Sequence, residues 1–350
     1  MGAAMISLMI RGLCDLNPEA VELYYSRGLF VGIRWLVDHT ISLIPVPMIY
    51  VFFFSLIIAF YLFVRKWKNN KSLVKDKILM IFYALLTFVS SLVTIFLWIW
   101  GFNYARIPIE EQIGFKPKAL KVVEIQQALY KLTPELLEAR FNLSTSDEAI
   151  NESQVPLDFE DQIVSLLRSA LAKNDIPTYS DVNPRMLKPK GLLKKFGAIG
   201  IYWPFVGESN LDAALHPLQW PEVMAHEITH AYGWGDEGTC SFVAYLALQD
   251  AEDPYLRYAG LLDYWRSLAS NYLRYEQEAY QNYRKTLPLG LVNDLNAINE
   301  RSRQYTEFFP KFRRKTYNVY LKTQGISEGL ENYNRVLMLV EAWKKDQEMD

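Results

Sequence analysis

The stretch WPEVMAHEITHAYGWGDEGTCSFVAYL, residues 220–246, contains two of the four histidines of the chain, four residues apart, with a glutamate directly after the first. Pro221 suits the first turn of a helix, and Gly233 is a natural signal for its end. The stretch therefore predicts one helix of about three turns. On such a helix His226 and His230 lie on the same face, one turn apart.

Two imidazoles placed in this way can bind one Zn²⁺ at N–Zn distances of about 2.0–2.1 Å. Glu227 follows His226 and lies beside the metal rather than on it. Its carboxylate can accept a proton from a zinc-bound water and pass it to a leaving amine. The alternative is an ordinary helix that reads H-E-x-x-H by chance, but the capping signals around the motif favour a metal site.

A catalytic zinc usually has three protein ligands, so a third must come from elsewhere. GWGDEG predicts a tight turn, and EGTCSFVAYLAL predicts a second helix with Asp236 as its N-cap. A helical hairpin of this kind can bring Glu237 back to the histidines as the third ligand. Ser241, one turn later, could hold a ligand by a hydrogen bond. The alternatives are that Glu237 only compensates the helix dipole, and that Cys240 is a small packed residue.

The composition gives no indication of a nucleic-acid partner. The 350 residues carry a formal net charge of -2, and 51% of them are hydrophobic. The chain has only two cysteines, Cys14 and Cys240, which argues against a disulfide framework and against a cysteine-rich zinc module. The other two histidines, His39 and His216, are interpreted as ordinary polar residues.

Two long apolar segments predict membrane spans. Neither Ile41–Val64 nor Ile78–Phe102 contains a charged residue. Because a helix rises about 1.5 Å per residue, each segment can cross a hydrocarbon layer of about 30 Å. The alternative is a pair of buried core helices, but uncharged runs of this length are uncommon in soluble folds.

The segment between the two spans, residues 65–77, carries six basic residues and one acid. Short loops with this excess of Lys and Arg stay in the cytoplasm. We therefore expect a transmembrane helical hairpin over residues 41–102, with its tip inside the cell and residues 103–350 outside the cytoplasm. Residues 1–40 form a partly apolar, amphipathic segment whose beginning, MGAAMISLMIRGL, is too short to span a membrane.

Three stretches, GIYWPFVGESN, WPEVMAHEITHAYGW and DEGTCSFVAYLAL, resemble an uncharacterised family of bacterial multi-pass membrane proteins. That family is catalogued as a domain of unknown function and is grouped with zinc metallopeptidases of the gluzincin type. PEAVELYYSRGLF, EDPYLRYAGLL and YNVYLKTQGISEGLENYNRVLMLVEAW are also similar, so the resemblance covers nearly the whole chain.

The resemblance implies that His226 and His230 are zinc ligands and that Glu227 is the catalytic carboxylate. Gluzincins take their third ligand from an E-x-x-A-[DN] element on the next helix, which places Glu237 in that role. This sequence departs from the element at two positions, with Cys240 for alanine and Ser241 for aspartate or asparagine.

The implied fold is zincin-like: mainly α-helical with a small β-sheet, preceded here by the transmembrane hairpin. In that fold an edge strand borders the substrate cleft, and GIYWPFVGE is the candidate for it. A peptide could add to this strand through backbone hydrogen bonds. The candidate cleft residues are Tyr202, Trp203, Pro204, Phe205 and Glu208.

We therefore expect a zinc metallopeptidase anchored in the bacterial cytoplasmic (inner) membrane, with Zn²⁺ as cofactor and its site outside the cytoplasm. Its expected partners are the lipid bilayer and a peptide or protein substrate in the envelope, with no nucleic acid. One alternative is a non-catalytic envelope protein that binds zinc. Another is a zinc hydrolase that cleaves an amide of the cell wall.

Overall fold

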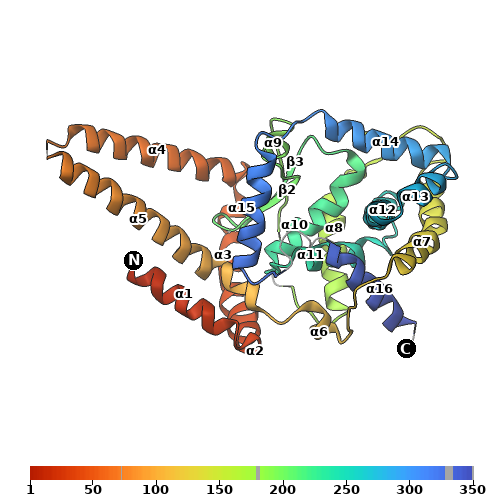
Figure 1. The fold of residues 1–350 in the computed structure, drawn as a ribbon, viewed down its shortest axis with the longest axis horizontal. Helices are drawn as coiled ribbons and strands as arrows, with labels where there is room; N and C mark the ends of the chain where they lie inside the picture. The colour runs from red at the N-terminus through yellow and green to blue at the C-terminus, as the bar shows by residue number, and fades with distance from the viewer. Residues whose placement is uncertain (72, 179–181, 328–333, 349–350) are drawn as a thin grey trace. The chain divides into compact units, whose positions relative to one another are not determined.

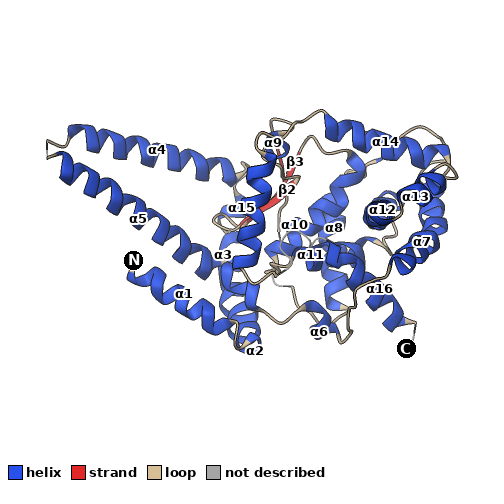
Figure 2. Cartoon of the chain, in the orientation of Figure 1, coloured by secondary structure: helices blue, strands red, loops and turns tan. Residues whose placement is uncertain are grey.

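The computed structural model describes all residues except 72, 179–181, 328–333 and 349–350. The described chain is mainly helical and contains a small three-stranded sheet (Figure 2), which agrees with the predicted composition of the fold. The chain divides into two compact units. The N-terminal unit contains Met1–Ile107 and the short segment Trp203–Glu208, and the second unit contains most of the remaining chain.

Among the described residues of Met1–Ile107 in this unit, every regular element is a helix. Its elements are α1 (Gly2–Cys14), α2 (Pro18–Ala20), a π-helix (Val21–Leu29), α3 (Phe30–Asp38), a 3₁₀ helix (Ile41–Leu43), α4 (Met48–Asn69), α5 (Val74–Ile99) and a second 3₁₀ helix (Gly101–Ala105).

The helices α4 and α5 are long and apolar enough to cross a membrane, and they form a helical hairpin (Figure 1). They have 22 and 26 residues, with mean hydropathy of 2.2 and 2.3 over their most apolar windows, and almost none of those side chains is buried. Apolar surface of this extent is unfavourable in water and is typical of a helix that contacts lipid or a partner.

The first apolar helix begins seven residues later than the uncharged segment does, at Met48 rather than Ile41. Pro45 and Pro47 explain the difference, because proline lacks the amide that a helix interior requires. The free amides at the start of α4 are satisfied by the carboxylate of Glu208, which accepts from Met48 N at 2.7 Å and from Ile49 N at 3.2 Å.

The second unit contains the remaining helices and most of the sheet. Its α-helices are α6 (Ile109–Ile113), α7 (Val122–Leu143), α8 (Phe159–Ala172), α9 (Leu192–Lys195), α10 (Trp220–Ala231), α11 (Glu237–Leu248), α12 (Pro254–Tyr275), α13 (Gln277–Arg284), α14 (Leu289–Arg303), α15 (Pro310–Thr323) and α16 (Arg335–Gln347). Two 3₁₀ helices, Glu152–Gln154 and Pro217–Gln219, lie between them.

The sheet consists of β1 (Arg185–Leu187), β2 (Gly200–Trp203) and β3 (Glu208–Asp212) in the order β1-β3-β2. β1 runs parallel to β3, with Met186 opposite Leu211. β2 is therefore an edge strand of the described sheet. The predicted strand GIYWPFVGE is shorter than expected, because the chain turns after Trp203 and returns as β3.

The core of the second unit surrounds α11. This helix is apolar on all sides except at its start, a pattern typical of a helix buried on every face. Phe242 on α11 is fully buried, as are Tyr255, Tyr258 and Trp265 on α12. Burial of aromatic side chains of this size stabilises a fold strongly, so α11 is held rigidly where it carries its polar residues.

Candidate metal centre

Local sequence signals mark both the start and the end of helix α10. It begins directly after the 3₁₀ helix Pro217–Gln219, and Pro221 lies in its first turn, where amides have no partner within the helix. Beyond its end, Gly233 adopts a left-handed φ of 87°, which other residues rarely adopt. His226 and His230 therefore lie one turn apart, and their ring centroids are 4.9 Å from each other.

The helix α11 begins with the predicted cap. The Oδ1 atom of Asp236 accepts a hydrogen bond from Thr239 N at 2.6 Å. The same oxygen accepts from Nη1 of Arg335 on α16 at 2.7 Å. These contacts satisfy a free amide of the helix and fix its first turn, which carries Glu237.

The hairpin of α10 and α11 brings three donor atoms together. Oε2 of Glu237 lies 3.0 Å from Nε2 of His226 and 3.4 Å from Nε2 of His230. Ligand atoms at about 2.0–2.1 Å from a tetrahedral zinc are themselves about 3.3 Å apart. Two imidazoles and one carboxylate with this spacing therefore fit the donor set of a zinc site.

The opposite nitrogen of each imidazole is held by a hydrogen bond. Nδ1 of His226 lies 3.0 Å from Oγ of Ser241, and Nδ1 of His230 lies 2.7 Å from the carbonyl oxygen of Trp234. Because a carbonyl only accepts, the Nδ1 atom of His230 carries a proton, so a metal would bind this imidazole at Nε2 once that nitrogen has lost its proton. The distance between Oγ of Ser241 and Nδ1 of His226 agrees with the predicted hydrogen bond from Ser241 to a histidine of the motif.

Cys240 offers a second possible ligand set, because ligand atoms of His226, His230 and Cys240 lie within 4.8 Å of one another. The sulfur, however, lies beside Nδ1 of His230, at 3.3 Å, and not beside the Nε2 atom that faces Glu237. It is also 3.5 Å from the carbonyl oxygen of Trp234. Burial also raises the pKa of the thiol to about 12, which disfavours the thiolate that binds metals. The geometry favours Glu237 as the third ligand.

Neighbouring side chains keep the carboxyl group of Glu237 ionised. Burial by itself raises the pKa of this carboxyl, but the imidazoles of His230 and His226 outweigh burial and hold the pKa well below its usual value. The side chains of His226, His230 and Glu237 are 9%, 11% and 5% exposed. An ionised carboxylate that is buried from water in this way can bind a cation.

Glu227 lies between the histidines and the sheet. A Cβ atom at Gly200 of β2 would lie 2.5 Å from its Oε1 atom, so only glycine allows the strand to approach this closely. The carboxylate accepts a backbone hydrogen bond from Tyr202, also on β2. Burial raises the pKa of Glu227, while His230 and His226 lower it to a smaller extent. A carboxylate with a raised pKa beside a metal centre is suited to accept a proton.

Tyr317 is a residue of the centre that the local sequence does not indicate. It lies on α15, and its hydroxyl donates to Oε1 of Glu237 at 2.6 Å. The two oxygens of Glu237 thus face different partners, Oε2 the histidines and Oε1 the tyrosine. This hydrogen bond orients the carboxylate toward the imidazoles.

The five predicted cleft residues divide between the two units. Tyr202 belongs to the unit of the metal centre, whereas the N-terminal unit contains Trp203, Pro204, Phe205 and Glu208. The rings of Trp203 and Phe205 lie against Phe52 of α4, with centroids 5.7 and 5.3 Å apart. The structure brings Tyr202 to Glu227 and gives Trp203, Phe205 and Glu208 partners on α4. A role of these residues in substrate binding stays a prediction.

A family model described as "Protein of unknown function (DUF3810)" matches residues 25–340. The match includes every residue of the candidate metal centre. No curated protein and no solved structure matches the chain.

Proposed function

We propose a function for this chain, which belongs to the DUF3810 family of proteins of unknown function: it is a membrane-anchored, zinc-dependent metallopeptidase of the gluzincin type. The observation that carries the proposal is the convergence of Nε2 of His226, Nε2 of His230 and Oε2 of Glu237. The buried carboxylate of Glu227 lies beside this donor set, and the order of the four residues is that of the gluzincin pattern.

Zn²⁺ bound to these donors would polarise the scissile carbonyl and lower the pKa of a water ligand to about 7. Glu227 accepts the proton of the attacking water and passes it to the leaving amine. Ser241 and Trp234 hold the two imidazoles in one orientation, and Tyr317 holds Glu237. These residues would contribute positioning and proton transfer.

The sheet supports a peptide or protein as the substrate. β2 is an edge strand, and its first residue, Gly200, lies against Glu227. An extended peptide can pair with an edge strand through its backbone, independently of its side chains. A peptide bound in this way lies next to the proton acceptor, which supports hydrolysis of a peptide or protein rather than of a small ester.

The two apolar helices support a location in the bacterial inner membrane as a multi-pass protein. Residues 65–77, which include the end of α4, the connection and the start of α5, carry the excess of basic residues that stays in the cytoplasm. Both outer ends of the hairpin then lie on the opposite side, together with the metal centre. The substrates on this account are peptides or proteins of the cell envelope.

A second function is favoured by one observation: all three donor residues are less than a tenth exposed, and Tyr317 contacts the remaining oxygen of Glu237. A centre enclosed to this degree also suits an envelope protein that binds zinc for stability and catalyses nothing. Structural zinc sites usually have four protein ligands, so the two functions differ in ligand number as well as in activity.

The full chain, purified in detergent, tests the proposal through zinc content and hydrolysis of a fluorogenic peptide mixture. Glu227→Gln should retain zinc and lose activity by about 10²–10⁴-fold, because it removes the proton acceptor and leaves every ligand in place. Glu160→Gln, the same change on α8, is the matched control and should retain both properties. Normal turnover by Glu227→Gln would exclude the proposed mechanism, and a zinc-loaded but inactive wild type would favour the second function.

A further inference from the structure

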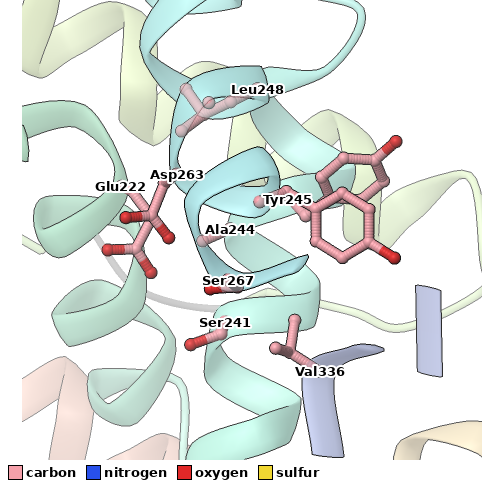
Figure 3. Close-up of a pocket in the computed structure, with 10 residues that line it drawn as sticks. Glu222, Ser241, Ala244, Tyr245, Leu248, Asp263, Ser267 and Val336 are labelled. Carbon is pink, nitrogen blue, oxygen red and sulfur yellow. The ribbon is translucent and has the colours of Figure 1, made fainter. Parts of the chain in front are cut away.

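Two features of the second unit lie outside the proposed ligand set. Figure 3 shows the first, a small cavity that Glu222, Ser241 and Asp263 line with polar side chains. Ser241 also contacts His226, so this cavity belongs to the surroundings of the metal centre. The second feature is an exposed surface on α15, whose side chains have no part in the proposed reaction.

The helix α15 first has an inward face, which fixes how the helix is turned. Arg313, Tyr317 and Leu321 recur every four residues and therefore share this face. Arg313 forms an ion pair with Glu307, Tyr317 donates to Glu237, and Leu321 is fully buried. The other faces of α15 are consequently turned away from the rest of the unit.

The second face of α15 is apolar and exposed. Phe312 and Val319, seven residues apart on one side of the helix, are 71% and 53% exposed. Phe309, directly before the helix, is also exposed and lies 6.5 Å from Phe308 between ring centroids. Phe308 in turn contacts the exposed ring of Phe196, at 5.9 Å. These five residues form the aromatic patch. Proteins in water rarely expose a contiguous apolar patch without a binding role.

The third face of α15 is basic. Its exposed residues are Lys311, Arg314, Lys315 and Lys322. Among the residues that the structure describes, none of these four forms an ion pair. The helix contains five basic residues and no acidic one, although the whole chain has a net charge of -2. Lys195 adds a further charge, because its ammonium group lies 5.8 Å from the ring centroid of Phe308.

An apolar face next to a basic face is typical of a helix that lies in the interface of an anionic membrane. Aromatic rings enter the boundary between headgroups and acyl chains, and lysines and arginines bind the lipid phosphates. A second copy of the chain fits this surface less well. In a symmetric dimer the basic faces of the two copies would meet and repel each other.

We propose that α15 is a lipid-binding helix, and that the aromatic patch and the basic face dock the second unit on a bilayer that contains anionic phospholipid. The inference rests on the proposed location in a membrane and on no part of the proposed zinc chemistry. On that proposal α4 and α5 keep the chain at the bilayer, so docking of α15 is an intramolecular step at high effective concentration.

Docking through α15 has a consequence for the substrate. Tyr317 connects this helix to Glu237, so a docked α15 holds the metal centre near the surface of the bilayer. Peptides that are attached to the membrane or lie close to it then reach the centre more readily than peptides in free solution. The substrate class narrows to membrane-proximal segments of envelope proteins.

Photo-crosslinking of the full chain in lipid nanodiscs tests the docking. Photoreactive p-benzoylphenylalanine replaces Phe312 in one variant and Phe141, an exposed phenylalanine on α7, in the control. The nanodiscs contain phosphatidylcholine and the anionic phosphatidylglycerol. Crosslinking at position 312 should add the mass of a lipid, whereas crosslinking at position 141 should not.

The role of charge is measured with the same probe at position 312. Each basic residue near an anionic bilayer typically raises binding about fivefold. Lys311→Gln combined with Lys315→Gln should therefore lower lipid crosslinking about fivefold or more, and so should nanodiscs of phosphatidylcholine alone. Lys173→Gln combined with Lys285→Gln removes two exposed lysines elsewhere in the unit and is the matched control.

Equal lipid crosslinking at positions 312 and 141, or crosslinking of position 312 to a second copy of the chain instead of lipid, would overturn the inference. Lipid crosslinking that depends on neither the lysines nor the anionic lipid would also overturn it. The readout needs neither zinc nor hydrolysis, so failure of the proposed peptidase activity leaves the inference standing. A full chain that does not insert into nanodiscs would overturn the membrane location and the inference together.

Discussion

Oε2 of Glu237 lies 3.0 Å from Nε2 of His226, although the two residues belong to different helices. The neighbouring acid, Asp236, instead accepts from Thr239 N and from Arg335. Two adjacent carboxylates thus have different roles, one at the centre and one as a helix cap.

Replacement of these two acids by alanine should separate the roles. Glu237→Ala removes the proposed third ligand. It should weaken zinc binding more than the loss of a hydrogen bond to a ligand does, which typically costs about 10–100-fold. Asp236→Ala should lower the free energy of unfolding by about 0.5–2 kcal/mol and leave zinc affinity nearly unchanged. Chelator competition and thermal unfolding measure the two effects, and the assignment is wrong if Asp236→Ala loses zinc while Glu237→Ala does not.

Tyr317→Phe should weaken zinc binding by up to about 10-fold, a smaller loss than that of Glu237→Ala. The variant removes the hydroxyl that donates to Oε1 of Glu237 and retains the aromatic ring. Tyr275→Phe, which removes an exposed hydroxyl on α12, is the control. Equal zinc affinity in Tyr317→Phe and the control would show that α15 does not orient the carboxylate.

His216 should make the fold sensitive to acid. Its Nδ1 atom accepts from Leu218 N, and burial, followed by the charges of Arg301 and Arg266, lowers its pKa from 6.5 to about 4. His216 of the unfolded chain therefore binds a proton below pH 6.5, whereas His216 of the folded chain binds it only near pH 4. Stability contributed by neutral His216 is present above pH 6.5 and is lost as the pH falls toward 4, by at most about 3 kcal/mol.

His216→Gln should consequently show a smaller loss of unfolding free energy between pH 7 and pH 4.5 than the wild type. Denaturant unfolding at the two pH values measures it, and both chains are first treated with EDTA so that protonation of the zinc ligands does not contribute. An unchanged loss in the variant would mean that His216 does not control this transition.

Reporter fusions test the orientation in the membrane. An enzyme that is active only in the cytoplasm should work when inserted between α4 and α5, after residue 70. One that is active only outside should work when fused after residue 350. The opposite pattern would place the metal centre inside the cell and exclude envelope substrates.

Local signals predicted the parts of the fold that depend on neighbouring residues. Pro221, Gly233 and Asp236 define the ends of α10 and α11, and the spacing of the histidines then determines the face on which they lie. The apolar segments likewise became α4 and α5, with the start of α4 displaced by two prolines. These features follow from helix geometry and backbone chemistry alone.

Contacts between distant segments were not predictable in this way. Tyr317 follows Glu237 by 80 residues, and its helix carries no motif. β1 lies in a basic, proline-containing segment that indicates a loop, and it becomes a strand only because β3 supplies a parallel partner.

X-ray absorption at the zinc K edge of the purified full chain tests the metal centre most directly. His226, His230 and Glu237 predict a first coordination shell of nitrogen and oxygen at about 2.0–2.1 Å, with imidazole scattering from two rings and no sulfur. A sulfur shell at about 2.3 Å would place Cys240 on the metal and contradict the assignment of Glu237. A chain that carries no zinc after expression in zinc-supplemented medium would contradict the centre itself.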